Sequence, residues 1–391
     1  MATTAERMRA HRGPALLSAG FRPFFLFAAA WAAIAVAVWL PLWEGRIALP
    51  TAFSPLDWHV HELLYGYAPA AVAGFLLTAV PNWTGRLPVV GRPLLALVIA
   101  WALGRLAVLV SAWIGAVPAA VIDLLFLAGL TFVAAREVWA GRNTRNLKVV
   151  ALVAAAALGN AVFHAETILF GTAAWGTRIG IAALVILVVV IGGRIVPSFT
   201  LNWLRTRPPG RLAIPFGRFD TAVSAITTAA LALWVALPDA RLTGLALLVG
   251  GLANLARLAR WAGWRTWDEK LVLVLHVGYL FVGLGFLLLG ASLLGLPLAR
   301  SAALHAWTVG AVGLMTLAVM TRASLGHTGR PLHAGRAVSA LYLGGLVATF
   351  ARIAMGVGPA QMVFLHLAVA GWLVAFAGFA IVYFPILTRP R

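Results

Sequence analysis

The sequence predicts an all-α, polytopic membrane protein with about twelve transmembrane helices. Its 391 residues are 62% hydrophobic and only 10% charged, whereas about a quarter of the residues in a soluble domain are charged. Its mean hydropathy is +0.95. A soluble core of this size could not bury so much apolar surface. Lipid must therefore be the solvent for most of the chain.

Twelve apolar segments each approach the roughly 20 residues that a spanning helix requires. Their connections are mostly short and polar, so we expect one transmembrane domain over residues 1–391. The first segment lacks a convincing cleavage site and is taken as the first helix. In order, the expected spans are Phe24–Leu42, His59–Val80, Pro93–Trp113, Pro118–Val138, Val149–Phe170, Gly176–Val196, Phe219–Leu237, Leu242–Trp261, Leu271–Leu294, Ala302–Met320, Ala337–Val357 and Met362–Phe384.

Basic residues follow every second span, and this asymmetry predicts the orientation, because cytoplasmic loops are enriched in Lys and Arg. The N-terminal segment, residues 1–20, is short and basic, and we place it in the cytoplasm together with the C-terminus. The opposite loops carry little beyond Arg46, Arg178, Arg241 and Arg300. The loops on the cytoplasmic side carry Arg86 and Arg92; Arg136, Arg142, Arg145 and Lys148; Arg205, Arg207, Arg211 and Arg218; Arg257, Arg260, Arg265 and Lys270; Arg330 and Arg336; and Arg389 and Arg391.

Charge and cysteine content exclude several classes of function. The net charge of +19 would suggest nucleic acid, but the Arg residues lie between apolar segments rather than on one polar face. We therefore expect a lipid environment and no nucleic-acid partner. The chain has no Cys, which excludes disulfides, thiolate zinc sites and iron–sulfur clusters.

Five of the nine histidines are expected at one depth, in the outer half of the membrane. An ionisable group in hydrocarbon costs several kcal/mol, so each one requires a partner or a role. His164, for example, lies six residues before the outer end of its span, or roughly 9 Å deep. The predicted metal ligands of this layer are His59, His61, His164, His305 and His366.

The layer also contains acids and one amide that could support these ligands or carry protons. They are Glu62, Glu166, Asp123 and Asn160, and Asn160 lies one helical turn from His164. A metal or haem site is one interpretation, since imidazole suits copper, iron and zinc. A proton relay and unrelated interfacial residues are the alternatives.

A second polar group is predicted at the cytoplasmic side. His276 lies near the inner start of the ninth span, and Arg194 and Arg322 lie where the sixth and tenth spans end among small and hydroxyl residues. With His327 they form a candidate cofactor-binding group, for an anion or a haem propionate, with His276 as an axial ligand. Positive-inside loops with turn residues would look the same.

Short segments near the inner ends of the second, sixth and tenth spans resemble one another, which indicates a faint internal repeat. Pro81-Asn82-Trp83-Thr84 resembles Pro197-Ser198-Phe199-Thr200, at a separation of 116 residues (197 − 81). Arg194 and Arg322 are 128 residues apart (322 − 194). Both shifts correspond to about four helices, which predicts three four-helix units.

Several short segments together make the sequence similar to the NnrS family. The segments are Gly20-Phe21-Arg22-Pro23-Phe24-Phe25, His59-Val60-His61-Glu62, Pro81-Asn82-Trp83-Thr84-Gly85, Gly193-Arg194-Ile195-Val196-Pro197-Ser198-Phe199-Thr200, Leu275-His276-Val277-Gly278-Tyr279, Leu304-His305-Ala306-Trp307-Thr308-Val309-Gly310 and Leu325-Gly326-His327-Thr328-Gly329-Arg330-Pro331. The similarity extends over nearly the whole chain.

This resemblance implies a bacterial inner-membrane protein that contains b-type haem and copper and relieves nitrosative stress, often alongside denitrification. We also expect nitric oxide or a related small molecule as its partner, and a membrane electron donor such as a quinol. It leaves open whether the protein is an oxidoreductase. Haem-copper oxidases also have twelve-helix cores in three four-helix arcs, an analogy of architecture alone. The other function class that fits is a proton-coupled secondary transporter that uses the buried His and carboxylates.

Overall fold

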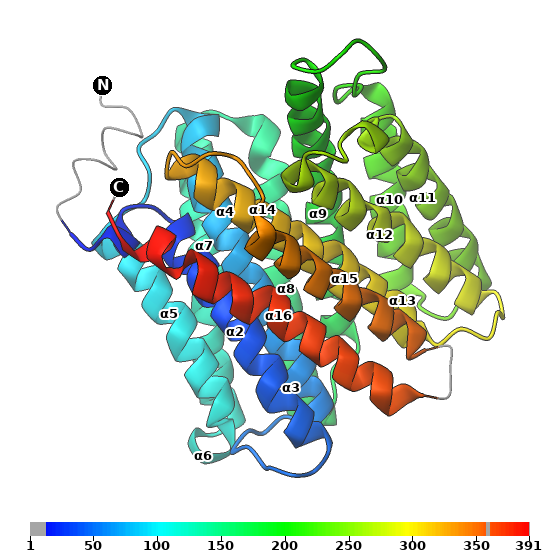
Figure 1. Ribbon diagram of the computed structural model, residues 1–391. Helices are drawn as coiled ribbons and strands as arrows, with labels where there is room; N and C mark the ends of the chain where they lie inside the picture. The colour runs from blue at the N-terminus through cyan, green and yellow to red at the C-terminus, as the bar shows by residue number, and fades with distance from the viewer. Residues whose placement is uncertain (1–12, 357–359, 391) are drawn as a thin grey trace. The chain divides into compact units, whose positions relative to one another are not determined.

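The computed structural model describes residues 13–356 and 360–390, and every regular element in these ranges is a helix. Figure 1 shows their course along the chain. Two of the short elements, η2 and η5, are π-helices, and η1, η3 and η4 are 3₁₀-helices. The elements are η1 (Ala15–Leu17), α2 (Phe21–Trp43), α3 (Pro55–His61), η2 (Glu62–Tyr67), α4 (Ala68–Thr84), α5 (Arg92–Leu109), α6 (Ser111–Ile114), α7 (Ala116–Ala140), η3 (Thr144–Asn146), α8 (Leu147–Phe170), α9 (Trp175–Leu204), α10 (Arg218–Ala236), α11 (Arg241–Ala259), η4 (Gly263–Arg265), α12 (Lys270–Leu293), α13 (Arg300–His305), η5 (Ala306–Gly313), α14 (Leu314–His327), α15 (Arg336–Ala354) and α16 (Gln361–Thr388).

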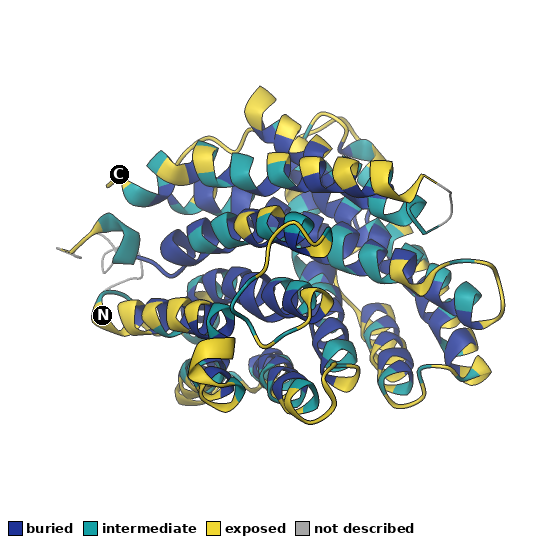
Figure 2. Cartoon of the chain, turned by 90° about the horizontal axis from the view of Figure 1, so that it is seen from below, coloured by how far each residue is buried: buried dark blue, intermediate teal, exposed yellow. Residues whose placement is uncertain are grey.

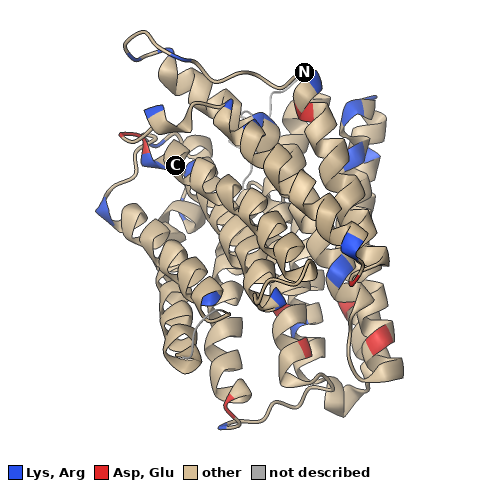
Figure 3. Ribbon diagram, turned by 90° about the vertical axis from the view of Figure 1, so that its right-hand side faces the viewer, with Lys and Arg blue, Asp and Glu red and all other residues tan. Residues whose placement is uncertain are grey.

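Twelve spans among the described residues are long and apolar enough to cross a membrane, as predicted. The second is continuous through α3, η2 and α4, and the tenth through α13, η5 and α14. Figure 2 shows that many helices are buried along one side and exposed along the other. Figure 3 shows that most of the helical surface carries no charged residue. An exposed helix surface without charged residues is suited to contact with lipid.

Several spans are longer than the apolar runs that predicted them. The sixth continues through Pro197 to Leu204, and the tenth continues past Arg322 to His327. A helix satisfies its own backbone hydrogen bonds, so it can continue into polar sequence after the apolar run has ended. The connections that follow these two spans are correspondingly short, at 205–217 and 328–335.

The chain divides into two compact units. The first contains the described residues up to Ala183, Ala323–Arg330 and those from Phe376 onward; the second contains the described parts of Leu184–Arg322 and Pro331–Ala375. Grouping into three four-helix arcs stays a prediction. The second, sixth and tenth spans are nevertheless all 28 or 30 residues long and about 70% buried, which is consistent with a period of four.

Two local features shape the first unit: the start of the second span and the close packing of two helices beside it. Ser54 caps α3, because its hydroxyl accepts a hydrogen bond from the Asp57 backbone N–H at 3.1 Å, and Pro55 follows as the first helical residue. On the neighbouring helices, α5 packs closely against α7. A Cβ at Gly104 would lie 3.1 Å from the Cα of Asp123, so only glycine allows this approach.

Candidate metal centre

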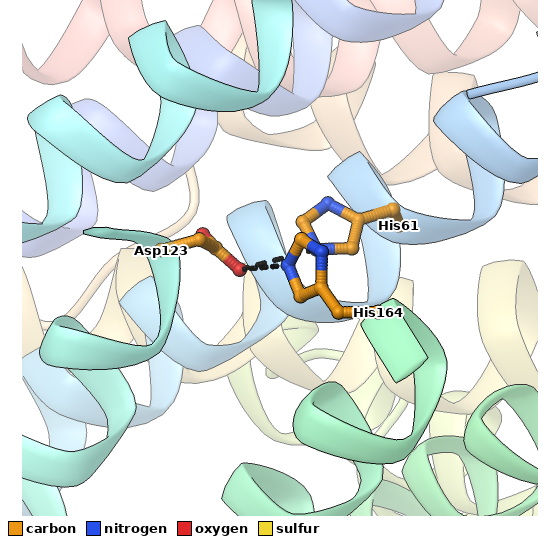
Figure 4. A group of neighbouring side chains, drawn as sticks. All are labelled: His61, Asp123 and His164. Atoms are coloured by element: carbon orange, nitrogen blue, oxygen red, sulfur yellow. Dashed lines mark hydrogen bonds and ion pairs between the residues drawn. The ribbon is translucent and has the colours of Figure 1, made fainter. Parts of the chain in front are cut away.

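Three potential metal ligands meet inside the first unit. His61 is the last residue of α3, Asp123 lies on α7 and His164 on α8. Each is six or seven residues from the end of its span, or about 9–11 Å along the helix. Their ligand atoms all lie within 4.8 Å of one another. Figure 4 shows the two rings and the carboxylate facing a common point.

The two distances between Asp123 and the histidines match the edges of a metal coordination shell. The Asp123 Oδ2 atom is 3.2 Å from His61 Nε2 and 3.0 Å from His164 Nε2. Two ligands with metal bonds of about 2.0–2.1 Å lie roughly 2.8–3.4 Å apart in tetrahedral or octahedral geometry. All three residues are at least 96% buried. A single ion could therefore be bound with little movement of these side chains.

Asn160 fixes the hydrogen-bonding pattern at the common point. Its Nδ2 donates to Asp123 Oδ2 at 2.7 Å, so its Oδ1 is the atom that faces His61 Nε2, at 3.1 Å. The His61 Nε2 atom thus faces two acceptor oxygens. Its other ring nitrogen, Nδ1, lies 3.1 Å from Glu62 Oε1.

This arrangement needs a proton or a metal ion beyond what one neutral His61 between ionised carboxylates supplies. A neutral imidazole has one N–H and one lone pair, yet both His61 nitrogens face acceptors. The ring can be doubly protonated, a carboxyl of Asp123 or Glu62 can carry the proton instead, or Nε2 can bind a metal ion while Nδ1–H donates to Glu62. The last arrangement is usual for histidine ligands, whose outer nitrogen is commonly held by a carboxylate.

Arg105, on α5, connects the two carboxylates of the group. Its Nη1 donates to both oxygens of Glu62 at 2.8 Å, and its Nη2 pairs with Asp123 Oδ1. Trp31 Nε1 also donates to Glu62, at 2.6 Å. With neutral histidines, these two carboxylates and one guanidinium leave the cluster with one negative charge. One further positive charge is needed to balance it in a buried site.

A π-helical turn brings neighbouring residues to the same site. Adjacent residues of an α-helix point in different directions, but His61 and Glu62 both contact this cluster, at the start of π-helix η2. π-Helical turns are rare and occur frequently at functional sites. Gly66 in this turn makes room for Arg105, because a Cβ there would lie 2.6 Å from Nη1.

Aromatic side chains enclose the histidines. The Phe53 ring lies 5.1 Å from His61 and 5.5 Å from His164, between ring centroids. Phe163 and Tyr65 lie 5.3 and 5.6 Å from His61. Phe53 belongs to the loop between α2 and α3 and is only partly buried, so it separates the site from the exterior at this end of the spans.

The other predicted members of the layer lie elsewhere. The His59 ring stacks on Trp39 with centroids 4.1 Å apart. Glu166 accepts hydrogen bonds from the backbone N–H groups of Trp175 and Gly176, at 3.0 and 2.8 Å, and thereby caps α9. A carboxylate is favourable at a helix N-terminus, which gives Glu166 a structural role.

His305 and His366 belong to the second unit. His305 Nδ1 lies 2.6 Å from the Ser301 carbonyl oxygen, and its Nε2 lies 2.7 Å from Arg352. His366 Nδ1 lies 2.8 Å from the Met362 carbonyl oxygen, and its ring is exposed. Both therefore hold Nδ1–H against the preceding turn, which leaves Nε2 as the basic nitrogen.

The predicted cytoplasmic group is spread over both units. In the second, Arg194 lies 5.6 Å from the Phe216 ring and Arg322 lies 4.3 Å from the Phe199 ring. In the first, the His327 ring packs against Phe21 at 5.5 Å.

His276 lies in the second unit, where its Nε2 is hydrogen bonded and its buried Nδ1 has no hydrogen-bond partner among the described residues. Thr200 donates its hydroxyl to the Val196 carbonyl, so it accepts from His276 Nε2 at 2.8 Å. A Cβ at Gly263 would lie 2.5 Å from Nδ1. Thr200 therefore engages Nε2, and Gly263 closely approaches Nδ1.

Two buried arginines were absent from the predicted site residues. Arg105 could have been found, since it is the one ionisable residue inside the expected span 93–113 and would need a partner there. Arg257 was assigned to a cytoplasmic loop, but it is fully buried in the second unit. It donates to Asp220 at 2.8 Å and to the Tyr279 hydroxyl at 3.1 Å. It lies inside the expected span Leu242–Trp261, so the signal that applied to Arg105 applied to it as well.

The chain matches one family of known proteins. The model of the family described as NnrS protein matches residues 15–391. No curated protein matches the chain.

Proposed function

Because this chain belongs to the NnrS family, which is associated with the response to nitric oxide, we propose that it is a metalloprotein that binds nitric oxide inside the membrane. The site is the group His61, Asp123 and His164. On this proposal the site lies in the outer half of a bacterial inner membrane, and the spans follow the orientation given by the basic loops.

The environment of His61 is the observation that carries the proposal. Both ring nitrogens face acceptor oxygens at 3.1–3.2 Å, and the surrounding carboxylates exceed the one guanidinium by one charge. A bound cation satisfies both demands at once. The cation would attract both the Nε2 lone pair and the acceptor oxygens, which otherwise repel one another. Its positive charge would balance the one negative charge left on the cluster.

The donor set indicates a redox metal of the first transition row. Two imidazoles and one carboxylate suit iron and copper, and two histidines with one carboxylate are typical of non-haem iron sites with open positions. Arg105 holds Asp123 Oδ1, so this carboxylate would bind an ion through Oδ2 alone. Such an ion would offer an unfilled coordination position to a small molecule.

The protein would contribute positioning and a dry environment. Glu62 holds His61 through Nδ1, while Arg105 and Trp31 hold Glu62. Phe53 and its aromatic neighbours exclude water from the ring faces. Nitric oxide is small and uncharged, so it could enter an apolar enclosure that hydrated anions could not. Electrons for any reduction would come from a membrane donor such as a quinol.

Of the two cofactors that the family resemblance implies, the described residues fit copper better than haem at the predicted positions. Axial ligation by His276 would require it to release Thr200 or to move away from Gly263. We therefore derive the function from a metal ion at the His61 group, and no step depends on haem.

Metal analysis of the purified chain tests this proposal. The wild-type protein should contain iron or copper, and nitric oxide should change its electron paramagnetic resonance spectrum. His164→Ala should remove one equivalent of metal and that spectral change. His333→Ala replaces an exposed histidine in a loop and should retain both. Folded wild-type protein without metal would refute the proposal and favour the proton-coupled transporter.

A further inference from the structure

The second and tenth spans share a local design that points to a second metal site. His61 is followed by π-helix η2 and by Gly66 five residues later; His305 is followed by π-helix η5 and by Gly310 five residues later. π-Helical turns are uncommon in proteins. Their presence after a histidine in both spans, 244 residues apart (305 − 61), indicates an internal repeat.

The next span of each unit extends the repeat. Gly104-Arg105-Leu106-Ala107 on α5 corresponds to Ala351-Arg352-Ile353-Ala354 on α15, at a separation of 247 residues (352 − 105). In both units the guanidinium reaches the beginning of the preceding span. Arg105 contacts Glu62, which follows His61, and Arg352 contacts His305 itself.

The span after that also corresponds. Asp123 on α7 and His366 on α16 are 243 residues apart (366 − 123). Helices α15 and α16 are antiparallel and meet at Gly344 and Gly371, where a Cβ at 371 would lie 2.6 Å from the Gly344 carbonyl oxygen. This register places His366 within about one helical turn of Arg352 along α15. In register along its helix, His366 thus occupies the position that Asp123 holds in the first unit.

In the second unit, two neutral donors face one guanidinium. Arg352 Nη2 lies 2.7 Å from His305 Nε2, and Nη1 lies 2.7 Å from the sulfur of Met355. Among the described residues no acidic group acts electrostatically on Arg352. The two lone pairs thus converge on a position that already holds a positive charge.

We propose that His305 and Met355 form a second metal site, selective for a soft monovalent cation of the Cu(I) type, with His366 as the additional ligand. Imidazole and thioether are donors that Cu(I) prefers, whereas harder divalent ions favour carboxylate oxygen. The first site contains Asp123 and the second contains no acid, so the two sites would select different ions.

Arg352 would occupy the site when no metal is bound and leave when Cu(I) arrives. It lies two residues before the end of α15, and its long side chain could turn towards the membrane surface. This exchange of one cation for another predicts competition. The proposal does not rest on the function of the first site, because none of its residues belongs to that group.

Cu(I) titration of the purified full-length chain tests the second site. Competition with a chromophoric Cu(I) chelator should show one site whose affinity falls at least tenfold in Met355→Leu and in His305→Ala. Arg352→Gln should raise the affinity, because it removes the competing cation. A structural role for Arg352 would predict the opposite change.

X-ray absorption identifies the ligand directly. The chain has six Met and no Cys, so sulfur scattering around bound copper can come only from methionine. It should disappear in Met355→Leu and persist in Met320→Leu, a buried methionine near the far end of the span that carries His305. Persistence in Met355→Leu, or unchanged Cu(I) affinity in both site variants, would overturn the proposal.

A double variant separates the two sites. His61→Ala combined with His164→Ala should abolish binding at the first site and leave the Cu(I) equivalent intact. Failure of the first proposal alone would leave this Cu(I) equivalent in place. Loss of the Cu(I) equivalent in the double variant would show that the two groups form one site and would refute a separate second site.

Discussion

At the scale of single residues, His61 is distinguished by having both ring nitrogens engaged in a site without solvent. In water such a ring would exchange partners freely, but at full burial each unmet hydrogen-bonding group costs free energy. Glu62, Asp123 and Asn160 supply three acceptors and no donor to it. The identity of the positive charge at this ring therefore decides the chemistry of the site.

Arg105 should contribute more to stability than any exposed arginine. Arg105→Met would leave Glu62 and Asp123 buried without their shared cation, and we expect unfolding to become easier by about 3–5 kcal/mol. Arg46→Met is the control, because Arg46 pairs with Glu44 while 71% of its side chain is exposed; its cost should be below about 1 kcal/mol. Denaturation in detergent, followed by circular dichroism, measures both. Equal stability would mean that the carboxylates are not charged in the fold.

At the scale of elements, the sequence predicted the twelve spans because each requires only a long apolar run. It also predicted that His164 lies six residues before the end of its span, but it put His61 two residues from the start of a span that begins four residues earlier than expected, at Pro55. It could not predict which spans are neighbours, and so Arg105 and Trp31 were not connected to Glu62. Nor could it predict the π-helical turns, because no residue composition specifies them.

Adjacent glycines on α9 should differ sharply in their tolerance of a methyl group. A Cβ at Gly193 would collide with the guanidinium of Arg257, which its ion pair with Asp220 holds in place. We expect Gly193→Ala to destabilise the protein by about 1–3 kcal/mol. Gly192→Ala would meet the flexible end of Met315 at 3.1 Å and the edge of the Tyr279 ring at 3.3 Å, so it should destabilise the protein less than Gly193→Ala does.

Thermal unfolding of the two glycine variants in the same detergent compares them directly. If Gly193→Ala unfolds at the wild-type temperature, the buried ion pair must be able to move, and it would not be a fixed part of the second unit.

At the scale of the whole molecule, orientation is the property that the loops encode most strongly. Trp267 lies in the connection before α12 and Leu296 in the connection after it, and they are 70% and 54% exposed. The positive-inside distribution places Trp267 in the cytoplasm and Leu296 outside. These two positions should therefore react oppositely to a reagent that cannot cross the membrane.

Cysteine labelling can measure this orientation without any background, because the chain has no Cys. In intact cells, an impermeant maleimide should label Leu296→Cys and spare Trp267→Cys; after permeabilisation both should react. The reverse pattern would invert the topology and place the His61 group in the inner half of the membrane.

The buried Arg22 has a consequence for how the protein is made. Its Nη1 donates to the backbone carbonyls of Leu387 and Arg389, at 3.0 and 2.9 Å, although more than 360 residues separate them. A ribosome delivers the first helix long before the last one, at roughly 5–20 residues per second. For many seconds the guanidinium near the start of α2 therefore has none of these carbonyl acceptors, because they have not yet been synthesised. Closure of the first unit is therefore among the final events of biogenesis, completed only when α16 emerges.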